Sequence, residues 1–204
     1  MTNHLFLDLD GTLIDSSRRQ HALFNELAPQ SQFTYADYWR IKRRRISQKS
    51  MLQQYFHYSD AQAEIFHEAW IRQIEAPQRL ATDTPFPGVT HFLRRAAERC
   101  TLCLATARQR PDAVAEQLNR FGWQGLFTHV FVTQQTQSKA ALITAILSPE
   151  RTDRFVGDTG EDIQAARELG VEAIAVSSGV LDADVLREYN PDRVLASVTE
   201  LEIQ

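Results

Sequence analysis

The stretch Leu5-Phe6-Leu7-Asp8-Leu9-Asp10-Gly11-Thr12 joins a short apolar run to two carboxylates and a glycine. The apolar run predicts a buried β-strand. Residues i and i+2 of a strand point to the same side, so we expect Asp8 and Asp10 to face one pocket at the strand's carboxyl end. An ordinary turn is the alternative interpretation, because Asp-Gly pairs are also common in turns.

Two carboxylates so close together repel each other. They are tolerated when a cation lies between them or when one of them holds a proton. A hard cation with oxygen ligands, such as Mg²⁺, meets the first condition. A protonated carboxylic acid meets the second and can protonate a leaving group. The pair therefore indicates a metal site, an acid-base site, or both.

Composition restricts the class of protein. A chain of 204 residues with 43% apolar residues is long enough for one domain, or for one domain with a large insertion. A net charge of −4 argues against a nucleic-acid partner. No apolar run has the length of a membrane span and no apolar signal segment begins the chain, so no membrane partner is expected. Cys100 and Cys103 fall on opposite faces of an expected strand, which predicts free thiols in a reducing, cytoplasmic compartment.

Short β-rich runs alternate with helical patterns along most of the chain. Such alternation predicts an α/β fold, a Rossmann-like parallel sheet with helices on both faces, that binds ligands beyond the carboxyl ends of its strands. The expected strands are 4–9, 101–106, 128–133, 154–157, 172–176 and 193–196. The expected helices between them are 88–99, 111–121, 138–147 and 161–169.

The alternation is interrupted after the first strand. Helical periodicity continues there through 19–28, 35–47, 49–57 and 61–79. We therefore expect an all-helical cap subdomain at 15–84, inserted into an α/β catalytic core formed by 1–14 and 85–204. The alternative is that these helices pack on the flank of the sheet. The aromatic residues expected in the core of the cap are Phe24, Tyr38, Trp39, Tyr55, Phe56, Phe66 and Trp70.

Further acidic residues follow another expected strand, at 154–157. Asp158 comes directly after that strand, at the same edge of the sheet as Asp8, and would complete a site for a hard metal ion. Asp162 lies one helical turn later and is expected to support the site from behind.

Groups suited to anion binding lie at the end of one expected strand and at the start of one expected helix. Thr106, Ala107 and Arg108 end a strand and offer a hydroxyl, a backbone N–H and a guanidinium. Lys139 begins an expected helix and carries a compact positive charge suited to a phosphoryl oxygen. Threonines commonly end strands and most lysines are solvated, so it is the joint order of these residues that is informative.

That order resembles the haloacid dehalogenase superfamily, and in particular its phosphoglycolate-phosphatase-like members with a helical C1-type cap. Arg108 stands where many relatives have lysine, and Ala140 replaces a usual proline. The resemblance covers the whole chain. It rests on four motifs: Asp8-Leu9-Asp10-Gly11-Thr12, Thr106, Lys139 and Gly157-Asp158-Thr159-Gly160-Glu161-Asp162.

The resemblance implies a role for each of these residues. Asp8 would be the nucleophile, and Asp10 the acid and base. Mg²⁺ would be held by the Asp8 side chain, the Asp10 main-chain carbonyl and Asp158, with Asp162 behind them. The residues implied to hold the substrate's phosphoryl group are Thr106, Ala107, Arg108 and Lys139.

The implied activity is Mg²⁺-dependent hydrolysis of a small phosphorylated metabolite through an aspartyl-phosphate, by a monomer or a small homo-oligomer. Asp10 favours phosphoryl transfer to water over dehalogenation, which needs no leaving-group acid. Two alternatives stay open. One is a phosphosugar mutase of the same fold, and the other is a non-catalytic metal-binding or regulatory module.

A dense basic run at 40–45 is the candidate for substrate selection in the cap. Arg40 and Arg44 share a helical face, with Arg43 beside it, so a subset of these arginines is expected to reach the cleft. The alternative is a solvated surface patch.

Overall fold

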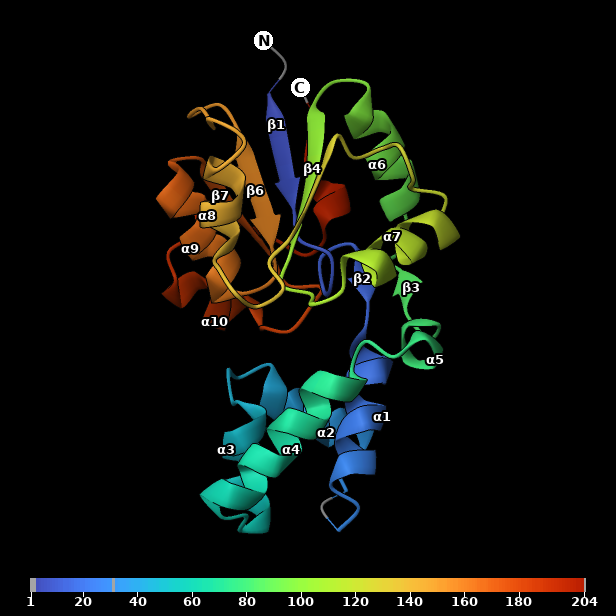
Figure 1. The fold of residues 1–204 in the computed structure, drawn as a ribbon. Coiled ribbons are helices and arrows are strands. Elements are labelled where there is room, and N and C mark those ends of the chain that lie inside the picture. Colours follow the sequence, from blue (N-terminus) through green and yellow to red (C-terminus); the bar gives the residue numbers. More distant parts are fainter. Residues whose placement is uncertain (1–2, 31, 204) are drawn as a thin grey trace.

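The computed structural model describes residues 3–30 and 32–203. A six-stranded sheet forms its centre, in the order β5-β4-β1-β6-β7-β8 (Figure 1). All five strand pairings are parallel, which confirms the expected sheet. The strands are β1 (His4–Leu7), β4 (Thr101–Thr106), β5 (His129–Val132), β6 (Arg154–Gly157), β7 (Glu172–Val176) and β8 (Arg193–Leu195).

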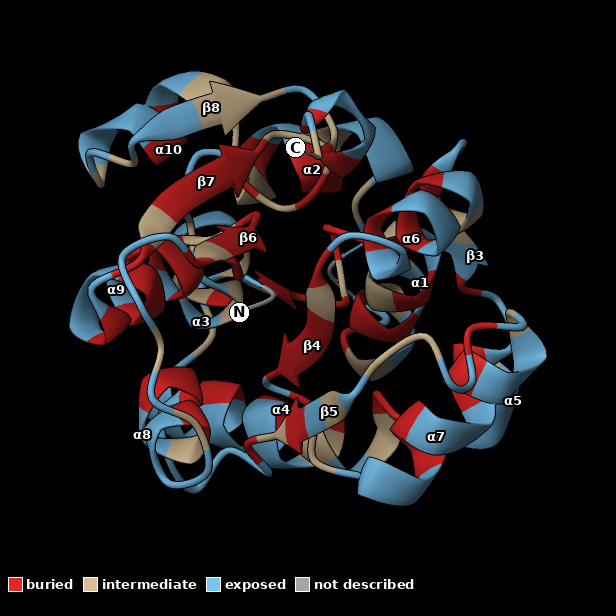
Figure 2. Cartoon of the chain, turned by 90° about the horizontal axis from the view of Figure 1, so that it is seen from above, coloured by how far each residue is buried: buried red, intermediate tan, exposed pale blue. Residues whose placement is uncertain are grey.

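Helices cover both faces of this sheet. Leu5 and Leu7 of β1 face one core cluster, together with α6 (Val89–Ala97) and α7 (Pro111–Arg120). Phe6 faces the opposite cluster, as expected from the alternation of side chains along a strand. That face is covered by α8 (Lys139–Thr144), α9 (Gly160–Leu169) and α10 (Ala183–Glu188). Figure 2 shows buried positions concentrated on β4, β6 and β7.

Local signals in the sequence fix the ends of these helices. The Ser138 hydroxyl accepts a hydrogen bond from the Ala141 N–H at the start of α8. Pro111 is the first residue of α7, where its missing N–H has no cost. Gly170 ends α9 in the left-handed conformation, with φ of 71°. These positions agree with the helix starts expected at 111 and 138 and with the helix end expected at 169.

Strand β1 lies between β4 and β6, at the point where the strand order reverses. In open parallel sheets this reversal leaves a crevice beyond the carboxyl ends of the two neighbouring strands. The segment that follows β1 leaves the sheet there, and so the two carboxylates of the opening motif are carried into the crevice.

A separate group of helices lies beyond the carboxyl ends of the strands (Figure 1). It has its own apolar cluster, which holds most of the expected aromatic residues, although Tyr55 is 47% exposed. This position disagrees with packing on the flank of the sheet. The helices are α1 (Ser17–Leu27), α2 (Tyr35–Lys42), α3 (Gln48–Phe56) and α4 (Asp60–Gln73), and below they are called the cap.

The chain enters and leaves the cap through one small element. Strands β2 (Ile14–Asp15) and β3 (Thr84–Pro85) pair antiparallel, so the two connections lie side by side. The expected boundaries at 14/15 and 84/85 fall inside this pair. The sequence did not predict it, because two-residue strands have no periodicity. Residues 1, 2 and 204 of the expected core lie outside the described residues.

Two expected cap helices end earlier than the pattern suggested. The segment expected as a helix at 61–79 is divided into α4 and a short α5 (Pro77–Leu80), because proline cannot continue a helix but can begin one. Helix α2 ends at Lys42, and Arg45 adopts a positive φ of 67° three residues later.

The two cysteines are buried and free, as the sequence predicted. Within the described residues, no helix has both the length and the apolarity needed to cross a membrane.

Candidate active site

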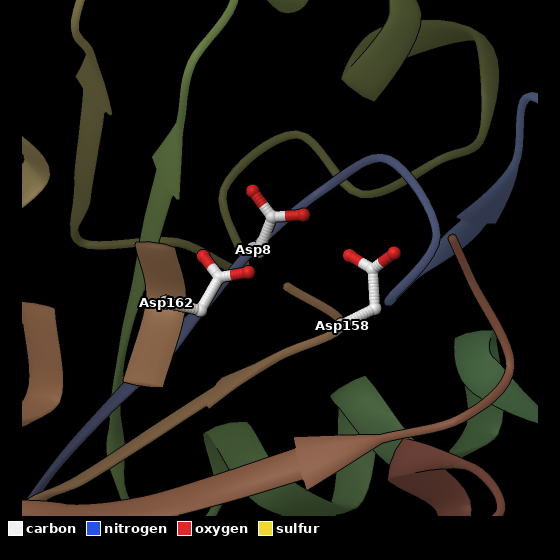
Figure 3. Close-up of side chains that lie close together, drawn as sticks. All are labelled: Asp8, Asp158 and Asp162. Carbon is white, nitrogen blue, oxygen red and sulfur yellow. The ribbon is translucent and has the colours of Figure 1, made fainter. Parts of the chain in front are cut away.

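Three buried carboxylates meet in the crevice beside β1. Asp8 follows β1, Asp158 follows β6, and Asp162 lies in the first turn of α9 (Figure 3). Each offers an oxygen atom, and these atoms lie within 4.8 Å of one another. The β1–β6 pairing continues up to this point, since the Asp8 N–H donates to the Val156 carbonyl at 3.0 Å. The parallel register therefore fixes how close the first two carboxylates are.

Lys139 is the cation within this cluster. Its Nζ lies 2.5 Å from Asp8 Oδ1 and 2.6 Å from Asp162 Oδ1. Burial opposes its charge, but the two carboxylates outweigh burial and raise the pKa of Lys139 above its usual value. Burial also raises the pKa of Asp8 to about 7, against the opposing effect of Lys139. The single positive charge of Lys139 thus compensates only part of the negative charge of the three carboxylates.

The backbone around Asp158 is shaped to admit its side chain. The carboxylate accepts hydrogen bonds from the Val180 N–H at 2.6 Å and from the Thr12 hydroxyl at 3.4 Å. A Cβ atom on Gly11 or Gly179 would lie 2.3 or 2.0 Å from Asp158 Oδ2, closer than real atoms approach. Burial, followed by the charges of the neighbouring aspartates, raises the pKa of Asp158 well above its usual value.

Asp162 serves the local structure and the cluster at once. Its Oδ2 accepts a hydrogen bond from the Thr159 N–H at 3.0 Å, which belongs to the capping box of α9, and another from the Thr159 hydroxyl at 2.7 Å. Its Oδ1 binds Lys139. The hydrogen bonds at the start of α9 therefore fix the side-chain conformation of Asp162. The sequence analysis expected this carboxylate behind the metal site, and the structure has it within the acidic cluster.

The donor chemistry of this cluster fits a hard divalent cation. All three groups offer carboxylate oxygens, the ligands that Mg²⁺ and similar ions prefer. Such an ion would offset the excess negative charge of the cluster and lower the raised pKa values of Asp8 and Asp158.

Asp10 has a different environment from the other aspartates. Its carboxylate accepts hydrogen bonds from Arg108 Nε at 2.6 Å and Nη2 at 2.9 Å, and from Arg19 Nη2 at 2.5 Å. Burial favours the neutral acid, but the two guanidinium groups outweigh it and hold the pKa of Asp10 well below its usual value. In this arrangement Asp10 is ionised.

A second carboxylate, Asp83, joins the two arginines. It accepts hydrogen bonds from Arg19 Nε at 2.9 Å and Arg108 Nη2 at 3.3 Å, and also from Gln117 at 3.0 Å. Sequence reasoning missed Arg19 and Asp83. Arg19 stands beside another arginine and Asp83 between two threonines, and the contact between them spans 64 residues of chain, so no local pattern marks them.

The phosphate-binding candidates lie on one loop after β4. The Thr106 hydroxyl accepts a hydrogen bond from the Arg108 N–H at 3.4 Å. The loop is held from the cap by Glu75, whose carboxylate accepts hydrogen bonds from the N–H groups of Gln109 at 2.8 Å and Arg110 at 3.0 Å. Glu75 is a further residue that the sequence did not indicate.

One cavity of about 300 Å³ collects these groups. It is lined by every residue that the sequence proposed for the site in the core: Asp8, Asp10, Thr106, Ala107, Arg108, Lys139, Asp158 and Asp162. The structure thus brings together segments that are up to 154 positions apart in the chain.

The basic run of the cap is directed elsewhere. Arg40 pairs with Asp37 on the surface and is 73% exposed. Arg44 pairs with Asp184 of α10, and Arg43 lies 3.6 Å from Asp182. The expected shared face of Arg40 and Arg44 is absent because α2 ends at Lys42. Two of these arginines therefore tie the cap to the core, and none of the three lines the cavity described above.

The fold and the site define a class of proteins: doubly wound α/β hydrolases with an acidic site at the first strand and a helical cap inserted after it. The model of the haloacid dehalogenase-like hydrolase family matches residues 5–176. The chain belongs to this family, and it is a hydrolase of the phosphatase type, similar to phosphoglycolate phosphatases.

Known relatives resemble the chain along nearly its full length. A phosphoglycolate phosphatase of Synechococcus elongatus is 28% identical over 211 residues, covering 97% of this chain and 94% of the relative. A haloacid dehalogenase-like hydrolase structure from Streptococcus pneumoniae has a TM-score of 0.78 at 22% identity, covering 96% and 94% of the two chains. The structure of a predicted phosphoglycolate phosphatase from Haemophilus somnus has a TM-score of 0.74 at 19% identity, covering 98% and 96%. These two structures support the fold.

Proposed function

We propose that the chain hydrolyses a small phosphorylated metabolite, with Mg²⁺ as cofactor and Asp8 as a nucleophile that becomes transiently phosphorylated. The observation that supports this proposal most directly is the buried cluster of Asp8, Asp158 and Asp162 around Lys139, inside the cavity that also contains Thr106. The named activity of the Synechococcus relative supports phosphomonoester hydrolysis.

In the first step the Asp8 carboxylate attacks phosphorus in line with the leaving oxygen. The bond between phosphorus and that oxygen breaks, and the alcohol takes a proton from Asp10. Water then attacks the phosphorus of the phosphorylated Asp8 and gives its proton to Asp10. The bond between phosphorus and the Asp8 oxygen breaks, which restores the Asp8 carboxylate and releases inorganic phosphate. The arrangement described is the ionised, base form of Asp10, suited to the second step. For the first step the contacts with Arg19 and Arg108 must loosen so that Asp10 can hold a proton.

The remaining groups act on the phosphoryl oxygens. Lys139 is fixed by two carboxylates and holds a positive charge at the site of reaction. The Thr106 hydroxyl and the Ala107 N–H are placed to donate to the other oxygens as charge builds on them.

A bound divalent cation would neutralise charge between an anionic nucleophile and a phosphate dianion. Two like unit charges at about 4 Å repel by roughly 4 kcal/mol at an effective dielectric constant of 20, so this contribution is large. Asp8 and Asp158 would hold the ion, with the Asp10 main-chain carbonyl as the third protein ligand that the family resemblance implies.

The free, buried state of Cys100 and Cys103 supports action in a reducing compartment such as the cytoplasm. A small phosphorylated metabolite is the substrate class that fits a cavity of about 300 Å³.

Phosphate release from a panel of small phosphomonoesters, with and without Mg²⁺, tests the proposal. We expect release that requires Mg²⁺ and is abolished by Asp8→Asn. Acid quenching of the wild type during turnover should trap phosphoprotein, and the same treatment of Asp8→Asn should not. Asp37→Asn, which removes an exposed carboxylate of the cap, is the matched control and should keep full activity. Release that survives in Asp8→Asn would overturn the assignment of the nucleophile.

A further inference from the structure

We infer that the alcohol released by this enzyme is uncharged and hydroxyl-bearing, as in a polyol or sugar phosphate, rather than carboxylated. The inference rests on the proposed function and specifies its substrate class. It comes from the charges and surfaces that the cavity presents beyond the phosphoryl group.

The arginines of the cavity already have anionic partners. Arg19 and Arg108 both contact Asp10, and both contact Asp83, so two guanidinium groups face two carboxylates. Their side chains are each 3% exposed. The two carboxylates match the charge of the two guanidinium groups, although Arg108 Nη1 has no hydrogen-bond partner in the described part of the chain. When Asp10 holds a proton for the first step, Asp83 remains the shared counter-ion of both arginines. Lys139 is likewise engaged by Asp8 and Asp162.

Glu75 adds a fixed negative charge to the cap side of the cavity. It is 6% exposed, lines the cavity, and is held by the N–H groups of Gln109 and Arg110. Within the described residues, no lysine, arginine or histidine lies at ion-pair distance from it, although the guanidinium groups of Arg108 and Arg110 are near enough to be influenced by its charge. A carboxylate on the leaving group would approach this charge in a partly desolvated cavity, where repulsion is strong.

The rest of the distal wall is neutral. Trp70, Ile74 and Val180 supply apolar surface, and Gln20 and Gln135 supply amide groups that can donate to and accept from hydroxyls. An aromatic surface beside neutral hydrogen-bonding groups suits the C–H face and the hydroxyls of a polyol or sugar.

The cap arginines that would supply extra positive charge do not line this cavity. Arg44 pairs with Asp184, and Arg43 lies beside Asp182. The basic run thus gives no counter-ion to an acidic leaving group, although the sequence alone suggested one.

Matched pairs of substrates test the inference. The first pair is 2-hydroxyethyl phosphate and phosphoglycolate, which differ by a hydroxymethyl group in place of a carboxylate. The second pair is glycerol 3-phosphate and 3-phosphoglycerate. In each pair we expect kcat/KM with Mg²⁺ to be about tenfold or more higher for the substrate with the uncharged alcohol. The carboxylated substrate would place its negative charge near that of Glu75.

A variant identifies the residue responsible. Glu75→Gln removes the charge and keeps one of the two carboxylate oxygens, so it retains one of the two hydrogen bonds from the loop N–H groups. It should lower KM for the carboxylated substrates and change KM for the uncharged ones little, which a merely structural role would not do. Ile65→Ala, on the exposed surface of α4, is the control and should leave the ratios unchanged.

Calorimetric binding to Asp8→Asn gives a readout that does not depend on turnover. The uncharged member of each pair should bind more tightly. Equal or better binding and hydrolysis of the carboxylated members would overturn the inference, while Asp8-dependent phosphate release would still support the proposed function. If neither member of either pair binds or reacts, the inference is wrong. Activity on an unrelated phosphomonoester would then leave the proposed function standing.

Discussion

Replacing Lys139 with methionine should destabilise the protein strongly when no metal is present. The lysine side chain is 8% exposed and lies within 2.6 Å of both Asp8 and Asp162. Methionine fills a similar volume but carries no charge. Three buried carboxylates would then meet without the cation that separates them.

Removing one partner of a buried ion pair costs about 3–5 kcal/mol, because the remaining charge is left unpaired in a poorly solvated place. Lys139→Met should lower the free energy of unfolding by this amount at pH 7. Part of the loss should be recovered by Mg²⁺, since an ion at 100 times its dissociation constant stabilises the folded state by about 2.7 kcal/mol. The gain with Mg²⁺ should be larger in the variant than in the wild type, because the variant has one more uncompensated negative charge.

Urea unfolding followed by the fluorescence of the three tryptophans measures these free energies, in EDTA and in saturating MgCl₂. Lys49→Met is the matched control, because Lys49 pairs with Asp60 on the surface and should be replaceable without measurable loss. A loss in EDTA below about 1 kcal/mol, the scale of an exposed ion pair, would refute the reasoning. So would an equal gain from Mg²⁺ in the wild type and the variant.

Three further outcomes are expected. The pKa of Asp8 is raised from 3.8 to about 7, so the folded metal-free protein holds an extra proton between these values, and its stability in urea should fall as pH rises through that window. Saturating Mg²⁺ should flatten this dependence. Asp83→Asn should lower the free energy of unfolding by about 3 kcal/mol and slow turnover more than it changes KM, because the arginines that hold Asp10 lose their shared carboxylate; an unchanged melting temperature would contradict this. Gly179→Ala should weaken calorimetric Mg²⁺ binding by displacing Asp158, and unchanged affinity would contradict the close packing described.

The sheet could be predicted from sequence because its signals are local. Apolar runs mark the strands, and helix caps such as Ser138 and Gly170 mark the boundaries of neighbouring helices. The gathering of Asp8, Asp158, Thr106 and Lys139 in one cavity also follows from a simple rule, since the carboxyl ends of parallel strands share an edge.

The environment of Asp10 could not be predicted in the same way. Strand alternation places it beside the pocket but does not reveal that Arg19 and Arg108 hold its carboxylate. These contacts join residues 9 and 98 positions apart. The first comes from cap helix α1, and the second arises only when β1 and β4 pair in the sheet. The role of the basic run was missed for a related reason. The expected geometry assumed a continuous helix over 35–47, whereas α2 ends at Lys42.

The antiparallel pairing of β2 and β3 has a mechanical consequence. Because Ile14 pairs with Pro85 and Asp15 with Thr84, the two connections to the cap bend together. We expect the cap to rock about this ribbon as one rigid piece rather than to slide across the sheet. Rocking would separate Arg44 from Asp184 at the far rim while the ribbon itself stays intact. Product escape would then quicken as ionic strength rises, and solution viscosity would slow it.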